Sequence, residues 1–142
     1  MNAKAFLDTN ILVYLFDRHE PTKRRRAQEV FSKLAQAGAV VVSTQALQEF
    51  YVTVTRKLKP PLPPSEAREI LESLLEMTII QVDPAMILRA VETSQDHQVS
   101  LWDAIILHSA HQAQCTTLLT EHLHHGWQWQ GLRVENPFRA EA

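Results

Sequence analysis

Four acidic side chains stand beside predicted strand ends and helix starts, where together they could hold a divalent cation. Asp8 directly follows a short apolar run, and Glu121 follows another after a single threonine. Asp103 lies in the first turn of a predicted helix, and Glu49 lies in the second turn of another. Clustered carboxylates repel one another, by about 4 kcal/mol for two unit charges ~4 Å apart at an effective dielectric near 20. A hard cation offsets that repulsion, and carboxylates without a histidine or cysteine ligand pair point to Mg²⁺ or Mn²⁺ rather than Zn²⁺.

Each carboxylate also has a simpler interpretation when it is taken alone. Asp103 lies three residues after Ser100 and could serve only in a helix cap. Asp8 could be a turn residue, and Glu49 could be a solvated charge, although it lies well off the apolar stripe of its helix. A common site is favoured because all four acids approach one edge of the predicted sheet from distant parts of the sequence. A cation held there could activate a water and polarise a phosphodiester.

Short apolar runs alternate with longer stretches of helical periodicity along the chain. Residues 5–7, 39–42, 78–82 and 116–119 are predicted strands, and 132–134 is predicted to be a last edge strand. Strands that alternate with helices form a parallel sheet covered on both faces, whose working residues lie beyond the carboxyl ends of the strands. The sequence therefore predicts an α/β fold, a three-layer α/β/α domain with a central parallel sheet of four to five strands.

Capping residues and prolines set the expected helix boundaries. The expected caps or first residues of the helices are Asn10, Pro21, Ser43 or Thr44, Ser65, Asp83 and Ser100. Gly38 is expected to end the second helix. The proline-rich stretch at 60–64 is interpreted as a stiff loop rather than a domain boundary. One domain spanning residues 1–142 is therefore expected.

Composition narrows the class of protein further. The 142 residues are 45% hydrophobic and 21% charged, as in an ordinary globular domain, and the three glycines form no glycine-rich phosphate loop. The net charge of −2 excludes nucleic-acid binding by bulk charge, so such binding needs a local patch. Two basic stretches qualify, one at 23–26 and one formed by residues 56, 57 and 59. The single Cys115, with no signal peptide or membrane span in the sequence, predicts a cytoplasmic protein.

Four motifs resemble those of PIN-domain nucleases, in particular the VapC-type toxins of bacterial toxin–antitoxin pairs. Residues 6–14 (FLDTNILVY) resemble the first motif, 43–50 (STQALQEF) the second, 100–106 (SLWDAII) the third and 118–121 (LLTE) the fourth. The four motifs follow the order and spacing of that family, and together they extend over nearly the whole chain. The chain departs from the pattern at one point, because many members carry Asp two residues after the threonine of the fourth motif, where His122 stands here.

The resemblance implies an endoribonuclease that uses Mg²⁺, or Mn²⁺, to hydrolyse RNA on a PIN-like fold. By motif position the catalytic and metal-binding residues would be Asp8, Glu49 and Asp103, and the supporting polar residues Thr9, Asn10, Thr120 and His122. Glu121 would be a fourth metal ligand, or His122 would take that position, and the number of metal ions stays open. The implied partners are RNA, a cognate antitoxin protein that delivers a basic side chain to the acidic pocket, and a second copy of the chain in a homodimer.

Other interpretations stay open from the residues. His122 in place of a carboxylate is compatible with a PIN-like binding module of weakened catalysis that acts through a protein partner. A phosphotransfer domain of the receiver or haloacid-dehalogenase type is disfavoured, since Asn10 stands where a D-x-D motif requires Asp. His108 and His111 share one face of a predicted helix, but no third ligand at a recognised zinc spacing accompanies them.

Overall fold

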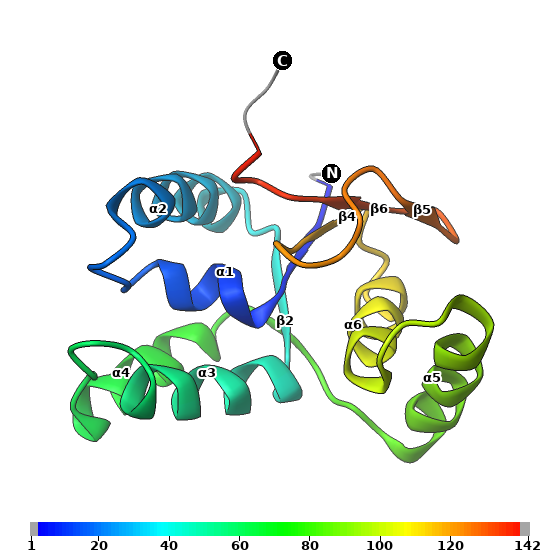
Figure 1. Ribbon diagram of the computed structural model, residues 1–142, viewed down its shortest axis with the longest axis horizontal. Helices are drawn as coiled ribbons and strands as arrows, with labels where there is room; N and C mark the ends of the chain where they lie inside the picture. Colours follow the sequence, from blue (N-terminus) through cyan, green and yellow to red (C-terminus); the bar gives the residue numbers. More distant parts are fainter. Residues whose placement is uncertain (1–2, 140–142) are drawn as a thin grey trace.

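The computed structural model describes residues 3–139 as a central sheet with helices on both sides (Figure 1). The strands are β1 (Ala5–Leu7), β2 (Val40–Ser43), β3 (Thr78–Ile80), β4 (Thr117–Leu119), β5 (Gln128–Trp129) and β6 (Leu132–Glu135). The helices are α1 (Thr9–Tyr14), α2 (Pro21–Gln36), α3 (Thr44–Arg56), α4 (Pro64–Leu74), α5 (Pro84–His97) and α6 (Leu101–Gln112). The first two and last three residues of the expected domain lie outside the described residues. The alternating α/β architecture confirms the predicted fold class.

The sheet has six strands in the order β3-β2-β1-β4-β6-β5, one more than the sequence predicted at most. Neighbouring strands are parallel from β3 through β6, and β5 is antiparallel to β6. The additional strand is a two-residue segment joined to β6 through Gln130 and Gly131, whose φ angles of 50° and 83° suit a tight hairpin. Such a short strand shows no period-two pattern in the sequence. The strand predicted at 132–134 is therefore not the edge of the sheet, because β5 lies outside it.

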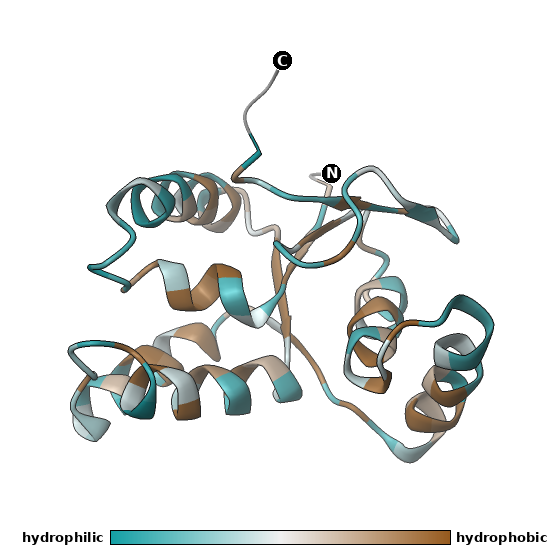
Figure 2. Ribbon diagram, in the orientation of Figure 1, coloured by the Kyte–Doolittle hydropathy of each residue, from teal (hydrophilic) through white to brown (hydrophobic). Residues whose placement is uncertain are grey.

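Alternating strand residues pack against opposite helical layers. Leu7 and Val42 belong to the apolar cluster shared with α1 to α4, whereas Phe6 and Val41 belong to the cluster shared with α6. Burial on both faces explains why these strands read as uninterrupted apolar runs. Figure 2 shows the same arrangement, with hydrophobic residues gathered along the inner strands and on the helix faces that turn toward them.

Two predicted helix caps are wrong, and three are confirmed, among them Asp83, which caps α5. Asp8 caps α1 in place of Asn10: its Oδ1 accepts a hydrogen bond from the Thr9 amide at 2.7 Å. The helix α4 begins at Pro64, ahead of Ser65, because a proline in the first turn needs no amide partner. Ser43 and Ser100 cap α3 and α6 as predicted, with their hydroxyls accepting from amides three residues later.

Cys115 packs in the core with 6% of its surface exposed, and burial raises the pKa of its thiol to about 11. Such a thiol is protonated at neutral pH and serves as a small apolar residue. Among residues 3–139, no helix combines the length and apolarity that crossing a membrane would require.

Candidate active site

Asp8 is the buried centre of the site, with 2% of its surface exposed at the carboxyl end of β1. The main chain of β1 and β4 fixes its position, because the Asp8 amide donates to the Leu119 carbonyl at 3.0 Å. Its carboxylate accepts from the Thr9 amide at 2.7 Å and from the Thr120 hydroxyl at 2.8 Å. Burial raises the pKa of Asp8, and the bonds from Thr120 and Thr9 oppose that rise.

Asp103 reaches the same place from the first turn of α6, and His122 joins it to Asp8. The His122 Nε2 atom lies 2.7 Å from Asp103 Oδ1, and its Nδ1 atom lies 3.5 Å from Asp8 Oδ2. The hydrogen bond to His122 lowers the pKa of Asp103, and the same bond raises the pKa of His122. An imidazole ring therefore bridges the two carboxylates.

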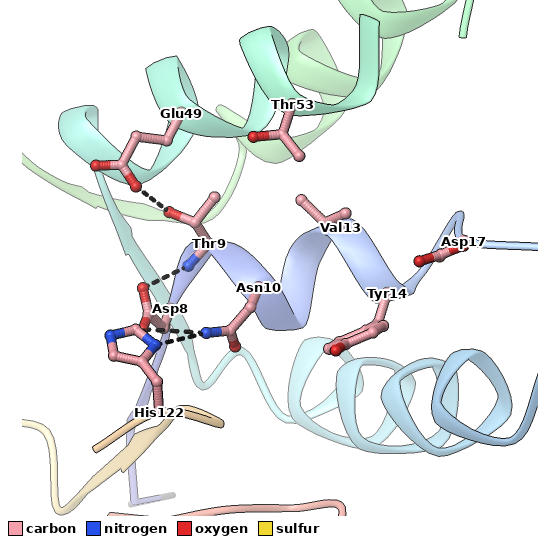
Figure 3. Close-up of a pocket in the computed structure, with 9 residues that line it drawn as sticks. All are labelled: Asp8, Thr9, Asn10, Val13, Tyr14, Asp17, Glu49, Thr53 and His122. Carbon is pink, nitrogen blue, oxygen red and sulfur yellow. Dashed lines mark hydrogen bonds and ion pairs between the residues drawn. The ribbon is translucent and has the colours of Figure 1, made fainter. Parts of the chain in front are cut away.

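Asn10 favours one tautomer of that ring when the ring is neutral. Its amide nitrogen lies 3.0 Å from His122 Nδ1 and 3.5 Å from Asp8 Oδ2 (Figure 3). An amide NH₂ group only donates, so in this arrangement Nδ1 accepts and the ring proton resides on Nε2, which donates to Asp103. The neutral ring thus satisfies both of its nitrogen atoms.

Glu49 faces the site from α3 and is held by two donors. The Thr9 hydroxyl donates to its Oε2 at 3.0 Å, and the Gln45 amide donates to its Oε1 at 2.8 Å. Figure 3 shows Glu49 and Thr9 pointing toward one another across the gap between α3 and α1. Thr9 bonds to Asp8 through its amide and to Glu49 through its hydroxyl, so it fixes the positions of both acids.

Glu121 lies apart from these three acids and faces α1 and α2. The Tyr14 hydroxyl donates to its Oε1 at 2.6 Å, and Lys23 forms an ion pair with its other oxygen. Burial alone would raise the pKa of Glu121, but the bonds from Lys23 and Tyr14 lower it. The Lys23 ammonium also lies 5.0 Å from the centre of the Tyr14 ring. The structure therefore brings together Asp8, Asp103, Glu49 and His122, and gives Glu121 a separate set of partners.

A pocket of about 360 Å³ opens between α1 and α3 beside these acids (Figure 3). Its lining residues are Asp8, Thr9, Asn10, Val13, Tyr14, Asp17, Glu49, Thr53 and His122. The sequence-based site omitted Val13, Tyr14, Asp17 and Thr53. Helical spacing could have found them, because Thr53 follows Glu49 by four residues and Tyr14 follows Asn10 by four.

The donor chemistry of the pocket fits a hard cation, although its side chains do not form a ready cage. Within residues 3–139, no group of three or more His, Cys, Asp or Glu side chains is arranged to hold a metal ion as it stands. Protein donors also contact the acids and offset part of the repulsion between them. Two buried oxygens beside them, Asn10 Oδ1 and Gln45 Oε1, have no hydrogen-bond partner. Carboxylate and amide oxygens are ligands that Mg²⁺ accepts.

The histidine pair on α6 is explained by packing. His108 Nε2 bonds to the Thr93 hydroxyl at 2.8 Å, and the ring lies edge-on to Trp129 with 5.0 Å between centres. Burial lowers the pKa of His108, which keeps the ring neutral. His111 contacts the same tryptophan, at 5.7 Å. Both histidines therefore help to cover the hydrophobic core.

The Asp103–His122 pair should make stability depend on pH. The folded pKa of His122 is raised above 6.5, so its contribution is complete below pH 6.5 and is lost as the pH rises through the folded value. The folded pKa of Asp103 is lowered below 3.8, so its contribution is complete above pH 3.8 and is lost as the pH falls further. In thermal unfolding without metal, the unfolding temperature of wild type should exceed that of His122→Gln by the largest margin between pH 3.8 and pH 6.5. A margin that stays constant up to pH 9 contradicts this assignment.

A family model and several solved structures match this chain. The PIN domain model matches residues 5–121. A toxin–antitoxin complex from Klebsiella pneumoniae superimposes with a TM-score of 0.72 at 24% identity, covering 96% of this chain and 100% of that chain. VapBC2 from Rickettsia felis, bound to a DNA fragment from its promoter, superimposes with a TM-score of 0.64 at 19% identity. That match covers 93% of this chain and 97% of the other. The Mycobacterium tuberculosis toxin VapC20, which cleaves the sarcin–ricin loop, superimposes with a TM-score of 0.58 at 17% identity. That match covers 81% of this chain and 87% of the other.

The comparison with curated proteins gave no match. At these identities the solved structures establish a shared fold. The family model extends from β1 through Glu121 and so includes every acid of the site. Because that model matches most of the chain, the chain belongs to the PIN domain family.

Proposed function

We propose that this PIN domain is a metal-dependent endoribonuclease, the toxin of a VapC-type toxin–antitoxin pair. The observation that supports it most is the acidic pocket, which is lined by Asp8 and Glu49, with Asp103 joined to Asp8 through the His122 ring. The three acids come from β1, α3 and α6, so only the folded chain assembles them. Structural likeness to toxins and toxin–antitoxin complexes agrees with this proposal.

Asp8, Glu49 and Asp103 would hold the ion, and the residues around them would orient their carboxylates. Mg²⁺, with Mn²⁺ as the alternative, would supply activation of a water and neutralisation of the phosphodiester charge. Thr120 and Thr9 fix the oxygens of Asp8, and Thr9 with Gln45 fixes those of Glu49. Glu121 remains a candidate fourth ligand, although its carboxylate bonds to Lys23 and Tyr14 in this structure.

The proposed partners follow from the same function. RNA would be the substrate, and the cytoplasm the place of action. A cognate antitoxin would restrain the nuclease, in agreement with the structural likeness to a toxin–antitoxin complex from Klebsiella pneumoniae. A homodimer could use the apolar surface of α5 and α6, where Leu88 and Trp102 are 70% and 61% exposed.

Metal removal tests the proposal directly. Purified chain is expected to cut single-stranded RNA in Mg²⁺ or Mn²⁺, to stop in excess EDTA, and to resume when the cation is restored. Gel analysis of end-labelled RNA would show discrete internal cuts. Cutting that continues undiminished in EDTA, or intact RNA with a folded protein that binds Mg²⁺, contradicts the proposal.

The position of His122 favours a second candidate, a PIN-like module of weakened catalysis that acts through a protein partner. Its ring bonds to Asp103 and lies beside Asp8, where it offsets their charge without an ion. Calorimetric titration with Mg²⁺ and Mn²⁺ separates the two candidates. The absence of binding at millimolar cation, with the fold intact, would favour the binding module.

A further inference from the structure

We propose that the cationic end of α3, formed by Arg56, Lys57 and Lys59, binds the phosphodiester backbone of the RNA strand that enters the acidic pocket. This inference rests on the proposed function, because it names where the substrate of that site lies. Lys57 is the central residue of the proposal, and Arg56 and Lys59 add charge beside it.

Two adjoining hollows form a groove along α3 that extends from Glu49 to Lys57. A second pocket of about 370 Å³ is lined by Gln48, Glu49, Val52, Thr53 and Lys57. It shares Glu49 and Thr53 with the acidic pocket, so the two hollows meet along α3. Figure 3 shows Glu49 and Thr53 in succession on that helix beside the acidic pocket.

Helix geometry places the cation at a useful separation from the acids. Glu49, Thr53 and Lys57 follow one another at four-residue steps, which puts them in one row along the helix surface. At 1.5 Å per residue, Lys57 lies ~12 Å along the axis from Glu49. That spacing lets a strand contact Lys57 through one phosphate while another phosphate lies at the acids.

The charge balance of the site requires such a cation. Asp8, Glu49 and Asp103 repel an approaching phosphate, and the chain carries a net charge of −2. RNA binding by a protein without excess positive charge depends on local lysines and arginines that neutralise phosphates. A cationic end on the groove would draw the strand toward the acids.

The two basic stretches of the sequence differ in how their side chains are paired in the structure. In the first stretch, Lys23 pairs with Glu121, and Arg26 pairs with Glu29 and donates to the Pro137 carbonyl. The other two cations of that stretch, Arg24 and Arg25, form no ion pair within the described residues, and neither lines the acidic pocket. In the second, Arg56, Lys57 and Lys59 are exposed. Their side chains make no ion pair or hydrogen bond with the rest of the described chain. The second stretch therefore keeps its charge available for a ligand.

A cation near a helix C-terminus also interacts with the helix dipole, which could account for Arg56 and Lys57 without any ligand. Lys33 provides the matched control, because it lies in the last turn of α2 and is exposed. It lines a different pocket with Lys4 and Thr116, which adjoin the amino ends of β1 and β4. A dipole role predicts the same effect for both lysines, whereas an RNA role predicts an effect for Lys57 alone.

The test is fluorescence anisotropy of a labelled single-stranded oligoribonucleotide with the full chain in EDTA, where metal-dependent cutting cannot occur. Binding is measured over a range of salt concentrations for wild type, Lys57→Ala, the triple alanine variant of residues 56, 57 and 59, and Lys33→Ala. The salt slope is expected to fall by ~0.7 for Lys57→Ala and by ~2 for the triple variant, with weaker binding at low salt. Lys33→Ala is expected to match wild type.

Each outcome has a distinct meaning. Wild-type slope and affinity in the triple variant, with wild type binding RNA, overturn this inference and leave the proposed function standing. Failure of folded wild type to bind RNA in EDTA overturns this inference, and failure to cut RNA in Mg²⁺ or Mn²⁺ as well overturns the proposed function. Equal loss in Lys57→Ala and Lys33→Ala overturns a specific role for the groove. Thermal unfolding of every variant checks that the fold is retained.

Discussion

Asp8→Asn and Asp103→Asn are each expected to lower metal-dependent RNA cleavage by at least about a hundredfold, the upper range for changes to groups that only support a metal ligand. Asp8 is the most buried acid of the pocket, and its oxygens are fixed by Thr9 and Thr120. An amide of the same shape keeps the cap of α1, because Asn and Asp cap helices about equally well. It removes the charge that would attract the cation. For Asp8→Asn the loss should therefore appear in cleavage and in Mg²⁺ affinity and not in folding, whereas Asp103→Asn should also lose the stability that the bond to His122 contributes.

Asp96→Asn is the matched control for these two variants, since Asp96 is an exposed acid on α5 that does not line the acidic pocket. The measurement is the initial rate of cleavage with Mg²⁺, accompanied by thermal unfolding of each protein. Full activity in either Asp8→Asn or Asp103→Asn contradicts the site. Glu121→Gln in the same assay decides the remaining candidate ligand, because undiminished activity would exclude Glu121 from the ion.

The positions of Asp8 and Asp103 could be predicted from the sequence because local signals fix them. Asp8 follows a three-residue buried strand, and parallel pairing of β1 with β2 and β4 brings the carboxyl ends of these strands to one edge. Asp103 follows a serine cap by three residues, and the observed bond from its amide to Ser100 reproduces that pattern. Strand periodicity and capping chemistry both act over a few residues, so a single sequence records them.

The partners of the acids could not be predicted, because they come from remote segments. Asn10 and His122 are 112 residues apart, and Lys23 and Glu121 are 98 apart. No spacing rule links such residues, since their contact depends on how α1, α2 and the loop after β4 pack in three dimensions. The expectation that clustered acids need a cation considered only their mutual repulsion. The folded chain also supplies Thr9, Gln45, Thr120 and His122 as donors to the carboxylates.

These donors explain how one sequence can keep an acidic pocket folded and still leave it suited to an ion. Hydrogen bonds to ionised groups contribute more than bonds between neutral groups, about 1.5–3 kcal/mol. A carboxylate oxygen has two lone-pair sites, so an oxygen that accepts from a threonine or from Gln45 can still bind a cation. The His122 ring differs, because it lies between Asp8 and Asp103 and occupies an oxygen of Asp103. His122 is thus the residue whose replacement should most alter metal binding.

His122→Asp is expected to tighten Mg²⁺ binding by about tenfold or more, the range in which ligand charge and supporting groups change metal affinity. The change frees Asp103 Oδ1 and adds a carboxylate at the position where many proteins that the chain resembles carry one. The same change should lower the unfolding temperature of the metal-free protein, because it removes the bond to Asp103 and adds a like charge beside Asp8. Mg²⁺ should then raise the unfolding temperature more in the variant than in wild type.

Calorimetric titration and thermal unfolding with and without Mg²⁺ measure both effects, with His124→Asp as the control. His124 is exposed two residues further along, so its replacement makes the same charge change away from the ring position. His122→Ala then distinguishes two roles of the imidazole. Tighter Mg²⁺ binding in His122→Ala means that the ring competes with the ion, whereas weaker binding means that the ring is itself a ligand. Unchanged Mg²⁺ affinity in both His122→Asp and His122→Ala contradicts any role of this residue at the metal site.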